Sequence, residues 1–350
     1  MSGSKLRAAR GRLSRAITAL LAALACVASL PAGIAPVAAA ASMTQPGDRP
    51  ALSAGHVRLQ PTTTAAGSTT IAWARLGAGP PLILLNGTAS PMADWDSALL
   101  AALSRRREVI VFDYPGLGSS GPAPATFTFA DMADWVAELA RAIGIGRTDV
   151  LGWSMGGFVA QELLRRHPEL VRRAVLAATN PGGSAATLGP KWVQDIDSDP
   201  DASLAAYFRT NFPRTRCAQR SARGFVNRVN AAIDAGRYPR SDVLDATAGA
   251  MVEAEDQWLN SNSNLDNLRR IRQKVMVMTG SADLVTPPPN SRIIARRVSR
   301  ASLLMFRGAG HSFLFQDPGL VASWTLRFLD ARGSALPIRR GVETACSRET

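Results

Sequence analysis

The chain has 350 residues, of which 46% are hydrophobic and 19% charged, enough apolar material for a large folded core. This composition excludes a disordered or collagen-like chain. The formal net charge is +13, but the arginines are scattered along the sequence rather than gathered in one run. Because a nucleic-acid-binding protein usually presents a clustered basic face, we expect no nucleic-acid partner.

The N-terminal segment, 1–41, has the order of a secretory signal peptide. Basic residues come first, an apolar run follows over 16–30, and a string of small residues completes the segment. The apolar run stops at Pro31, short of the roughly 20 apolar residues that a membrane-spanning helix needs. We therefore expect cleavage and a secreted or extracytoplasmic protein, with a linker over 42–55.

Two cysteines remain after this segment, Cys217 and Cys346. In an oxidising compartment two thiols pair if their Cα atoms come close enough, and sequence spacing does not settle that distance. A disulfide that ties the end of the chain to its middle and a pair of unlinked thiols are both open.

From residue 56 onward, short apolar runs alternate with helical patterns. The runs are mostly continuous and rich in β-branched residues, which is typical of strands buried on both faces of a largely parallel sheet. They occupy residues 70–74, 82–85, 109–112, 150–151, 174–177, 275–278 and 302–306. Helical patterns over 129–143 and 155–166 separate some of them.

The alternation of strands and helices is interrupted once. After residue 181 no convincing strand occurs for more than eighty residues, but amphipathic helical patterns do, for example over 204–211 and 225–235. Because the strand pattern then resumes, an insertion into one sheet is more economical than a second domain. The predicted units are an α/β core over 56–181 and 269–335, a helical cap over 182–268 and a C-terminal tail over 336–350.

A G-x-S-x-G motif lies between a predicted strand and a predicted helix, at Gly152-Trp153-Ser154-Met155-Gly156. A sharp strand-to-helix turn of this kind raises the serine hydroxyl above the sheet, and glycines on either side avoid crowding. Alone, the pentapeptide also fits a glycine-rich turn. The flanking strand and helix favour a nucleophile, Ser154.

The nucleophile needs a base, and the chain has three histidines, His56, His167 and His311. His56 precedes the core, and His167 ends the helix that begins after Ser154, about 20 Å away at ~1.5 Å rise per residue. Both are interpreted as surface or packing residues. His311 follows the run 302–306, at the carboxyl end of a strand, where open α/β sheets gather ligand-binding residues. We therefore predict His311 as the base.

The base needs a carboxylate that fixes its tautomer. Asp283 follows the run 275–278, again at the carboxyl end of a strand. The order serine, aspartate, histidine matches the order in hydrolases with a nucleophile elbow. The competing acids fall mainly in the predicted cap. Asp283 is therefore the predicted orienting acid, with turn capping as the alternative role.

Two backbone donors are predicted to bind the oxyanion of the transition state. One is the N–H of Met155, and the other is the N–H of Thr88 in the loop after the run 82–85. The triplet Asn86-Gly87-Thr88 also fits a glycosylation pattern, but an oxyanion loop is the simpler interpretation. A second glycine-rich turn, 113–120, is predicted to be structural only.

Taken together, these motifs resemble those of the α/β-hydrolase fold superfamily, in its serine-nucleophile branch, over about residues 70–330. The resemblance rests on 152–157, 113–119, 280–283 and Gly310-His311. It implies an α/β fold with a mostly parallel, eight-stranded sheet flanked by helices, an inserted helical cap, and no metal or organic cofactor. One departure is Asn86-Gly87, where many relatives carry His-Gly; we expect it to alter the hydrogen bonding of the loop and to leave the Thr88 donor available.

The expected function is that of a secreted serine esterase, which cleaves a small-molecule carboxylic ester with an apolar part through an acyl-enzyme intermediate. C–C bond hydrolases, aminopeptidases and perhydrolases share this arrangement, so they are alternatives. A non-catalytic ligand receptor of the same fold is an alternative from another class. Membrane association through the positive charge is a weaker one, and the sequence does not decide the oligomeric state.

Overall fold

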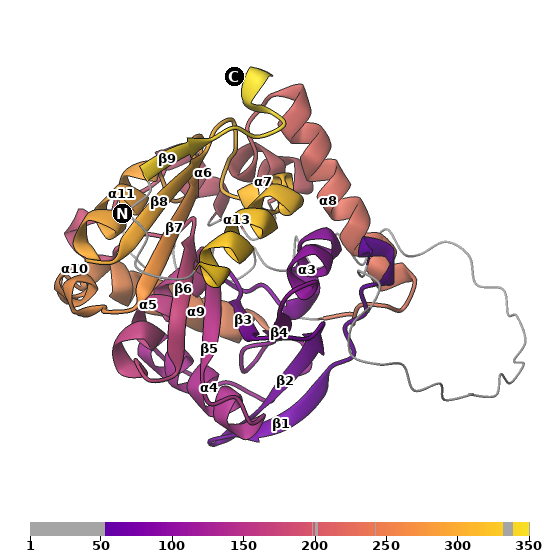
Figure 1. The fold of residues 1–350 in the computed structure, drawn as a ribbon, viewed down its shortest axis with the longest axis vertical. Helices are drawn as coiled ribbons and strands as arrows, with labels where there is room; N and C mark the ends of the chain where they lie inside the picture. Colours follow the sequence, from indigo (N-terminus) through magenta and orange to yellow (C-terminus); the bar gives the residue numbers. More distant parts are fainter. Residues whose placement is uncertain (1–52, 198, 200–201, 242, 332–338, 350) are drawn as a thin grey trace, which may run out of the picture.

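A computed structural model describes residues 53–349, except 198, 200–201, 242 and 332–338. The predicted signal peptide, 1–41, and most of the predicted linker lie outside the described residues. In the described part of the chain, nine strands form one twisted sheet at the centre of the molecule (Figure 1). Their order across the sheet is β1-β2-β4-β3-β5-β6-β7-β8-β9.

The sheet is antiparallel at one edge and parallel everywhere else. β1 pairs with β2 and β2 with β4 in antiparallel fashion, and all other neighbours are parallel. The strands are β1 (Thr62–Ala66), β2 (Thr69–Leu76), β3 (Pro81–Leu85), β4 (Glu108–Phe112), β5 (Thr148–Trp153), β6 (Val171–Ala177), β7 (Lys274–Gly280), β8 (Ala301–Phe306) and β9 (Arg339–Val342). The carboxyl ends of β3, β5, β7 and β8 therefore meet at one edge.

All seven apolar runs of the sequence lie in β2 to β8, but the expected number of eight strands is wrong, because nine are found among the described residues. β1 and β9 have no counterpart among the runs. β9 falls in the segment expected to be a tail and pairs with β8 from Leu303↔Arg339 to Phe306↔Val342. Because β9 has no apolar run of its own, only its pairing with β8 gives it the conformation of a strand.

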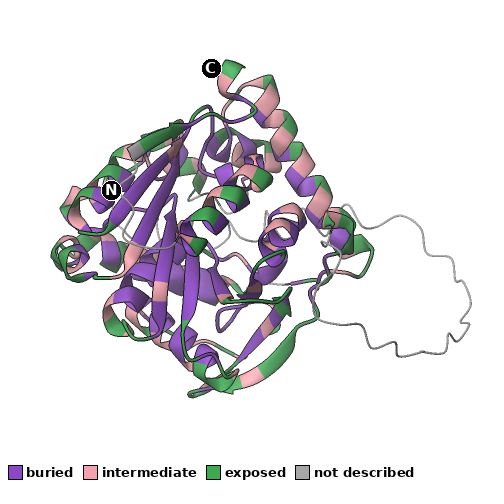
Figure 2. Ribbon diagram, viewed as in Figure 1, coloured by how far each residue is buried: buried purple, intermediate pink, exposed green. Residues whose placement is uncertain are grey.

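Helices cover both faces of the sheet, and their inward sides are buried (Figure 2). On one face α4, α5 and α11 pack against the strands through residues such as Met132, Phe158 and Ile294. On the other face α3 and α13 pack through Leu99 and Val321. The core helices and turns are η1 (Ala54–His56), η2 (Met92–Asp94), α3 (Ser97–Ser104), α4 (Phe129–Ala142), α5 (Met155–Arg166), α11 (Pro288–Arg297), α12 (Phe313–Gln316) and α13 (Pro318–Asp330).

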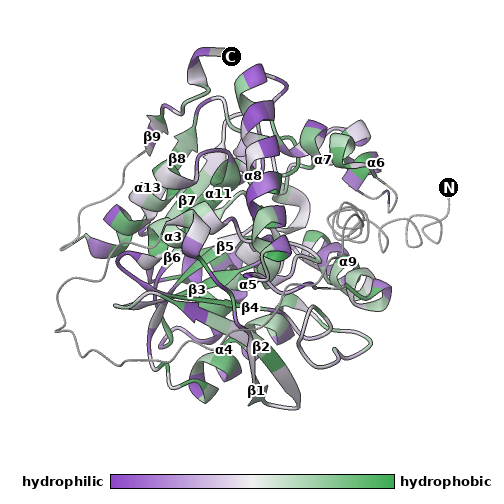
Figure 3. Ribbon diagram, turned by 90° about the vertical axis from the view of Figure 1, so that its right-hand side faces the viewer, coloured by the Kyte–Doolittle hydropathy of each residue, from purple (hydrophilic) through white to green (hydrophobic). Residues whose placement is uncertain are grey.

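The insertion between β6 and β7 is helical. It contains η3 (Gly183–Ala185), α6 (Lys191–Asp197), α7 (Leu204–Asn211), α8 (Arg216–Asp234), α9 (Asp245–Asn260), α10 (Ser263–Asn267) and η4 (Leu268–Arg270). The longest helix, α8, is amphipathic and buries Phe225, Val226 and Val229, while its outer side is strongly hydrophilic (Figure 3). Among the residues that the structure describes, no helix combines the length and the apolar character needed to cross a membrane.

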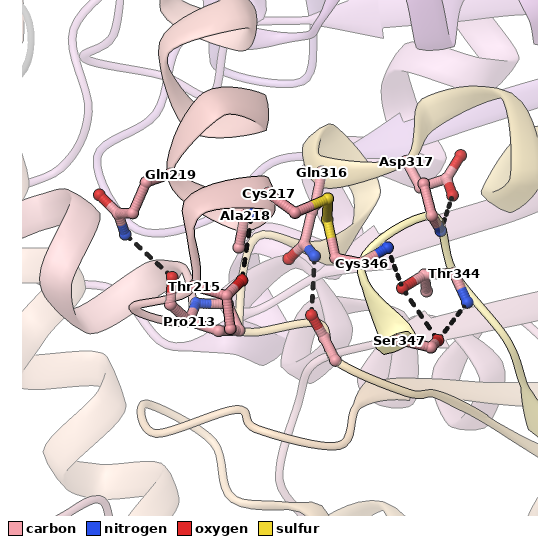
Figure 4. Close-up of a disulfide and its surroundings, with 12 residues drawn as sticks. Pro213, Thr215, Cys217, Ala218, Gln219, Gln316, Asp317, Thr344, Cys346 and Ser347 are labelled. Carbon is pink, nitrogen blue, oxygen red and sulfur yellow. Dashed lines mark hydrogen bonds between the residues drawn. A yellow bond between two sulfur atoms is a disulfide. The ribbon is translucent and has the colours of Figure 1, made fainter. Parts of the chain in front are cut away.

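A disulfide joins Cys217 in the first turn of α8 to Cys346 after β9, with the two Cα atoms 5.4 Å apart (Figure 4). Hydrogen bonds hold the segment that carries Cys346. The Thr344 hydroxyl donates to the carbonyl oxygen of Arg307 at 2.7 Å, and the Thr344 N–H donates to the Ser347 hydroxyl at 2.7 Å. Of the two alternatives left open by the sequence, the structure has the disulfide.

Candidate active site

Ser154 lies at the junction of β5 and α5 with a φ of 55°, a left-handed conformation that is uncommon for a residue other than glycine. Its N–H donates to the carbonyl oxygen of Ala177 at 2.9 Å, which fixes the turn to β6. A Cβ at Gly152 would lie 2.2 Å from the Gly156 oxygen, and one at Gly156 would lie 2.1 Å from the Leu85 oxygen. Only glycine therefore lets the strand and helix approach this closely.

The structure brings Asp283 and His311 together. His311 Nδ1 lies 3.1 Å from each carboxylate oxygen of Asp283, and both side chains are buried. The carboxylate also accepts hydrogen bonds from the N–H groups of Val285 and Thr286, at 3.0 and 2.9 Å, and from the Thr286 hydroxyl at 3.0 Å. With Nδ1 facing the carboxylate, Nε2 is the nitrogen left to accept a proton.

Ser154 and His311 line the same cavity. Trp153, between Gly152 and Ser154, connects them, because its indole N–H donates to the His311 carbonyl oxygen at 3.2 Å. The rings of Trp153 and His311 are 5.5 Å apart between centroids. The residues predicted as nucleophile and base thus line one cavity at the carboxyl edge of the sheet, and the predicted acid lies beside the base.

The loop after β3 passes directly beside Ser154. A Cβ built on Gly87 would lie 3.6 Å from the Cβ of Ser154 and 3.1 Å from the Trp153 ring. Thr88 lines the cavity, and Met155 begins α5. Within the described residues, no protein acceptor takes a hydrogen bond from the N–H of Thr88 or of Met155. Both predicted oxyanion donors therefore remain available to a ligand.

Asn86, the residue at which the sequence departs from the expected His-Gly pattern, stabilises this loop. Its side chain is buried; Oδ1 accepts a hydrogen bond from the Trp95 indole at 2.7 Å, and Nδ2 donates to the Ser90 carbonyl oxygen at 2.9 Å. A buried carboxamide with both ends occupied is a poor acceptor for a glycan. The sequence indicated the departure but not the two partners that explain it.

The glycine-rich turn after β4 has the structural role expected for it. The Asp113 carboxylate accepts hydrogen bonds from the N–H groups of Met92, at 2.7 Å, and Ser119, at 3.1 Å. Burial raises the pKa of Asp113 to about 6, against these two hydrogen bonds. Asp113 therefore ties its own turn to η2, which lies next to the oxyanion loop.

The cap supplies most of the apolar wall of the cavity. These residues include Ile196, Leu204, Phe225, Val229, Val252 and Leu259, from α6 to α9. Polar groups also line the cavity. The Tyr207 hydroxyl oxygen lies 3.1 Å from the hydroxyl oxygen of Ser312, the residue that follows His311. Such a cavity suits a ligand with an apolar body and one reactive polar group.

The other two histidines lie elsewhere. His56 Nδ1 is 2.6 Å from the Ser53 hydroxyl, and His167 Nε2 is 2.7 Å from Asp134 Oδ1. Neither lines the cavity. Among the residues that the structure describes, no group of three or more His, Cys, Asp or Glu side chains is arranged to hold a metal ion.

Sequence reasoning missed Asp94, which lines the cavity, and Thr286, whose hydroxyl is 3.3 Å from His311 Nδ1. Thr286 follows Asp283 by three residues, a spacing that allows a hydroxyl to return to an aspartate in a turn. Asp94 has no such local signal.

Comparison with known proteins supports the architecture. A family model described as the alpha/beta hydrolase fold matches residues 80–318. The chain is 29% identical over 278 residues to the polyketide synthase ThaQ of Burkholderia thailandensis, which covers 75% of this chain but only 12% of ThaQ. It is 28% identical over 247 residues to a pimeloyl-[acyl-carrier protein] methyl ester esterase of Nitrosomonas europaea, covering 69% of this chain and 92% of that protein.

Among solved structures, the chain is similar to an alpha/beta hydrolase fold protein from Chitinophaga pinensis, with a TM-score of 0.64 and 24% sequence identity. The match covers 80% of this chain and 100% of that one. This likeness is one of fold.

Proposed function

The chain belongs to the α/β-hydrolase fold family, and on that premise we propose that it is a secreted serine hydrolase that cleaves a carboxylic ester through an acyl-enzyme intermediate. One observation carries the proposal: His311, paired with the buried Asp283, lines the same cavity as a serine held in a left-handed turn. A ligand receptor needs the cavity but not this pair.

In the proposed reaction, Ser154 Oγ attacks the ester carbonyl carbon while His311 Nε2 takes the hydroxyl proton. Asp283 stabilises the imidazolium through Nδ1–H. The N–H groups of Thr88 and Met155 bind the oxyanion, an interaction worth about 10²–10³ in rate for one donor. His311 then gives the proton to the departing alkoxide. Water then attacks the acyl-serine while His311 Nε2 takes a proton from it. The acid leaves, and His311 returns the proton to Ser154 Oγ.

The cavity and one of the relatives support an ester as the class of substrate. Its apolar cap wall suits an ester with a sizeable apolar part. The Nitrosomonas europaea relative is named as an esterase of a methyl ester. An ester is therefore the first substrate class to test, ahead of the C–C, amide and peracid chemistries expected as alternatives.

Export is part of the proposal. The N-terminal order of basic, apolar and small residues supports it. The disulfide between Cys217 and Cys346 supports it independently, because such bonds persist in oxidising compartments and are rare in the cytosol.

The test is hydrolysis of p-nitrophenyl esters of increasing acyl length by the native protein and by Ser154→Ala. A matched control is Ser263→Ala, at an exposed position in α10 outside the cavity. We expect activity in the native protein and the control, and loss of at least about 10⁴-fold in Ser154→Ala. Unchanged hydrolysis by Ser154→Ala refutes the mechanism. A folded native protein that binds esters without turnover supports the receptor alternative instead.

A further inference from the structure

A carboxyl group stands in the cavity wall next to the oxyanion loop. Asp94, at the end of η2, lines the cavity, and its Oδ2 accepts a hydrogen bond from the Ser90 hydroxyl at 2.9 Å. Among the described residues, no second donor reaches this carboxyl group. Desolvation raises the pKa of Asp94 to about 7, and the charge of Asp113 adds to this effect while Ser90 opposes it.

Within the part of the chain that the structure describes, no cation balances Asp94 in the cavity. The described residues that line the cavity include two further acids, Asp197 and Glu255, and no lysine or arginine, although the chain carries 40 such residues. Arg228 precedes Val229, a cavity residue of α8, but its guanidinium group pairs with another acid. It donates to the carboxylate of Asp96 at 2.9 and 2.6 Å. The described lining of the cavity therefore holds carboxyl groups and no basic side chain, inside a protein of positive net charge.

Asp94 also lies near the reaction centre. Asp94, Ser154 and His311 line the same cavity, and so does Tyr207. The Tyr207 hydroxyl oxygen is 3.1 Å from that of Ser312, the residue after His311. Ser90, the donor to Asp94, belongs to the loop that passes Ser154. A substrate that extends from Ser154 through this cavity therefore meets the carboxyl group of Asp94 in its wall.

We propose that Asp94 selects substrates by charge, so that the cavity takes carboxylic esters whose acyl or alcohol part carries a basic amine and rejects those that carry a second carboxylate. This inference rests on the proposed ester hydrolysis. An ammonium group supplies both the opposite charge and the donors that the carboxylate lacks. A substrate carboxylate meets like charge where water is displaced, which is unfavourable.

The experiment uses p-nitrophenyl esters of three acids of similar length: heptanoic acid, 6-(dimethylamino)hexanoic acid and adipic acid as its monoester. At about pH 8, above the pKa of about 7, Asp94 is ionised. We expect kcat/KM for the amino ester to exceed that for the adipate ester by about 100-fold, the size of a lost close charge pair. The heptanoate ester should lie between them.

Asp94→Asn should reduce that ratio to below about tenfold, mainly by slowing the amino ester and improving the adipate ester. The matched control is Asp234→Asn, an exposed acid at the end of α8 that does not line the cavity and should leave the ratio unchanged. The charge series on the native protein tests the proposal even if Asp94→Asn fails to fold. A ratio near one in the native protein overturns it.

The two proposals fail in distinguishable ways. Hydrolysis of all three esters without regard to charge refutes selection by Asp94 and leaves the esterase intact. Hydrolysis of none refutes the esterase. In that case calorimetric binding of the same three esters to the native protein decides the inference, since tighter binding of the amino ester by about 100-fold supports it and equal binding overturns it.

Discussion

Thr286 holds the two buried members of the proposed triad in place. Its hydroxyl lies 3.0 Å from Asp283 Oδ2 and 3.3 Å from His311 Nδ1, and its N–H also donates to the carboxylate. It touches neither the cavity serine nor a reacting atom in the mechanism above. Its role is to position the acid and the base.

Thr286→Val should therefore lower kcat by about tenfold with little change in KM, because it removes a hydrogen bond to the carboxylate without changing the size of the side chain. Thr286→Ser, which retains the hydroxyl, should recover most of kcat. Steady-state kinetics on one ester measures both. A Val variant with native kcat, or one that Ser does not rescue, contradicts the positioning role.

Two desolvated carboxyl groups, the half-buried Asp94 and the buried Asp113, make the stability of the fold depend on pH. Burial raises the pKa of Asp94 from 3.8 to about 7 and that of Asp113 to about 6. A carboxyl group with a raised pKa binds its proton more tightly in the folded state. Its contribution is therefore full below about pH 4 and is lost as the pH rises toward the folded pKa.

Asp94→Asn cannot ionise, so the variant should be more stable than the native protein at about pH 8 and close to it at about pH 4.5. We expect the difference in Tm to grow by several degrees, roughly 3–6 °C, across this range. Calorimetry at the two pH values measures it, with Asp234→Asn as the exposed control. A difference in Tm that is the same at both values contradicts the burial of this charge.

At the scale of elements, helix α8 attaches the cap to the part of the core that carries the base. Phe225 of α8 stacks on Phe315 of α12 with 4.4 Å between ring centroids, and Arg228 pairs with Asp96, the N-cap of α3. The disulfide anchors the first turn of α8 to the segment after β9. The cavity wall and the loop of His311 are therefore held together at several points.

Replacing both Cys217 and Cys346 by serine should lower the free energy of unfolding by about 2–5 kcal/mol, because the bond closes a long loop in the unfolded chain. The sequence separation of the two cysteines is 129 residues. Urea denaturation of the variant and of the native protein, with and without reductant, measures the loss. A native protein whose stability is unaffected by the double substitution contradicts a role of the bond in holding the cap.

Elements differed in how far the sequence could predict them. Strands β2 to β8 were predictable because they contain apolar runs buried between layers of helices, whereas the polar edge strand β1 and the arginine-rich β9 owe their conformation to a neighbour. Helix α8 begins at Arg216, ahead of the expected 225, because its first turns combine the N-cap Thr215 with exposed polar residues. Polar turns of a helix leave little periodic signal.

The residues of the candidate site also differ in how far the sequence could predict them. Ser154, Asp283 and His311 could be predicted because each follows a strand whose carboxyl end faces one edge of the sheet. Asp94 and Trp153 could not be assigned roles, because the cavity that Asp94 lines and the His311 carbonyl that Trp153 binds are formed by segments distant in sequence. Only the fold brings those segments together.

In the folded molecule, a cluster of basic side chains forms at the amino ends of neighbouring strands. Arginines and one lysine that are scattered in sequence gather around a depression at the amino ends of β5 to β8, opposite the acidic cavity. They are Arg147, Arg172, Arg173, Arg272, Lys274 and Arg300. Burial and the charge of Arg172 lower the pKa of Arg173. The sequence suggested scattered charge because strand starts far apart in the chain become neighbours only in the sheet.

Removing one of these like charges should stabilise the protein at low salt. Arg300→Gln should raise Tm by about 1–2 °C at low ionic strength, and the gain should disappear at roughly 0.5 M NaCl because salt screens the repulsion. Arg223→Gln, at an exposed position of α8, serves as the control. Thermal unfolding at the two salt concentrations measures the effect, and a lower Tm at low salt contradicts net repulsion in the cluster.

If Ser154 carries the acyl group during turnover, the acyl-enzyme can be trapped and found on that residue. The native protein is mixed with a p-nitrophenyl ester, quenched in acid within the first turnover, and measured by intact and peptide mass spectrometry. We expect a mass increase of one acyl group on the peptide that contains Ser154 and none in Ser154→Ala. Turnover without this adduct, or the same adduct in Ser154→Ala, would contradict the mechanism.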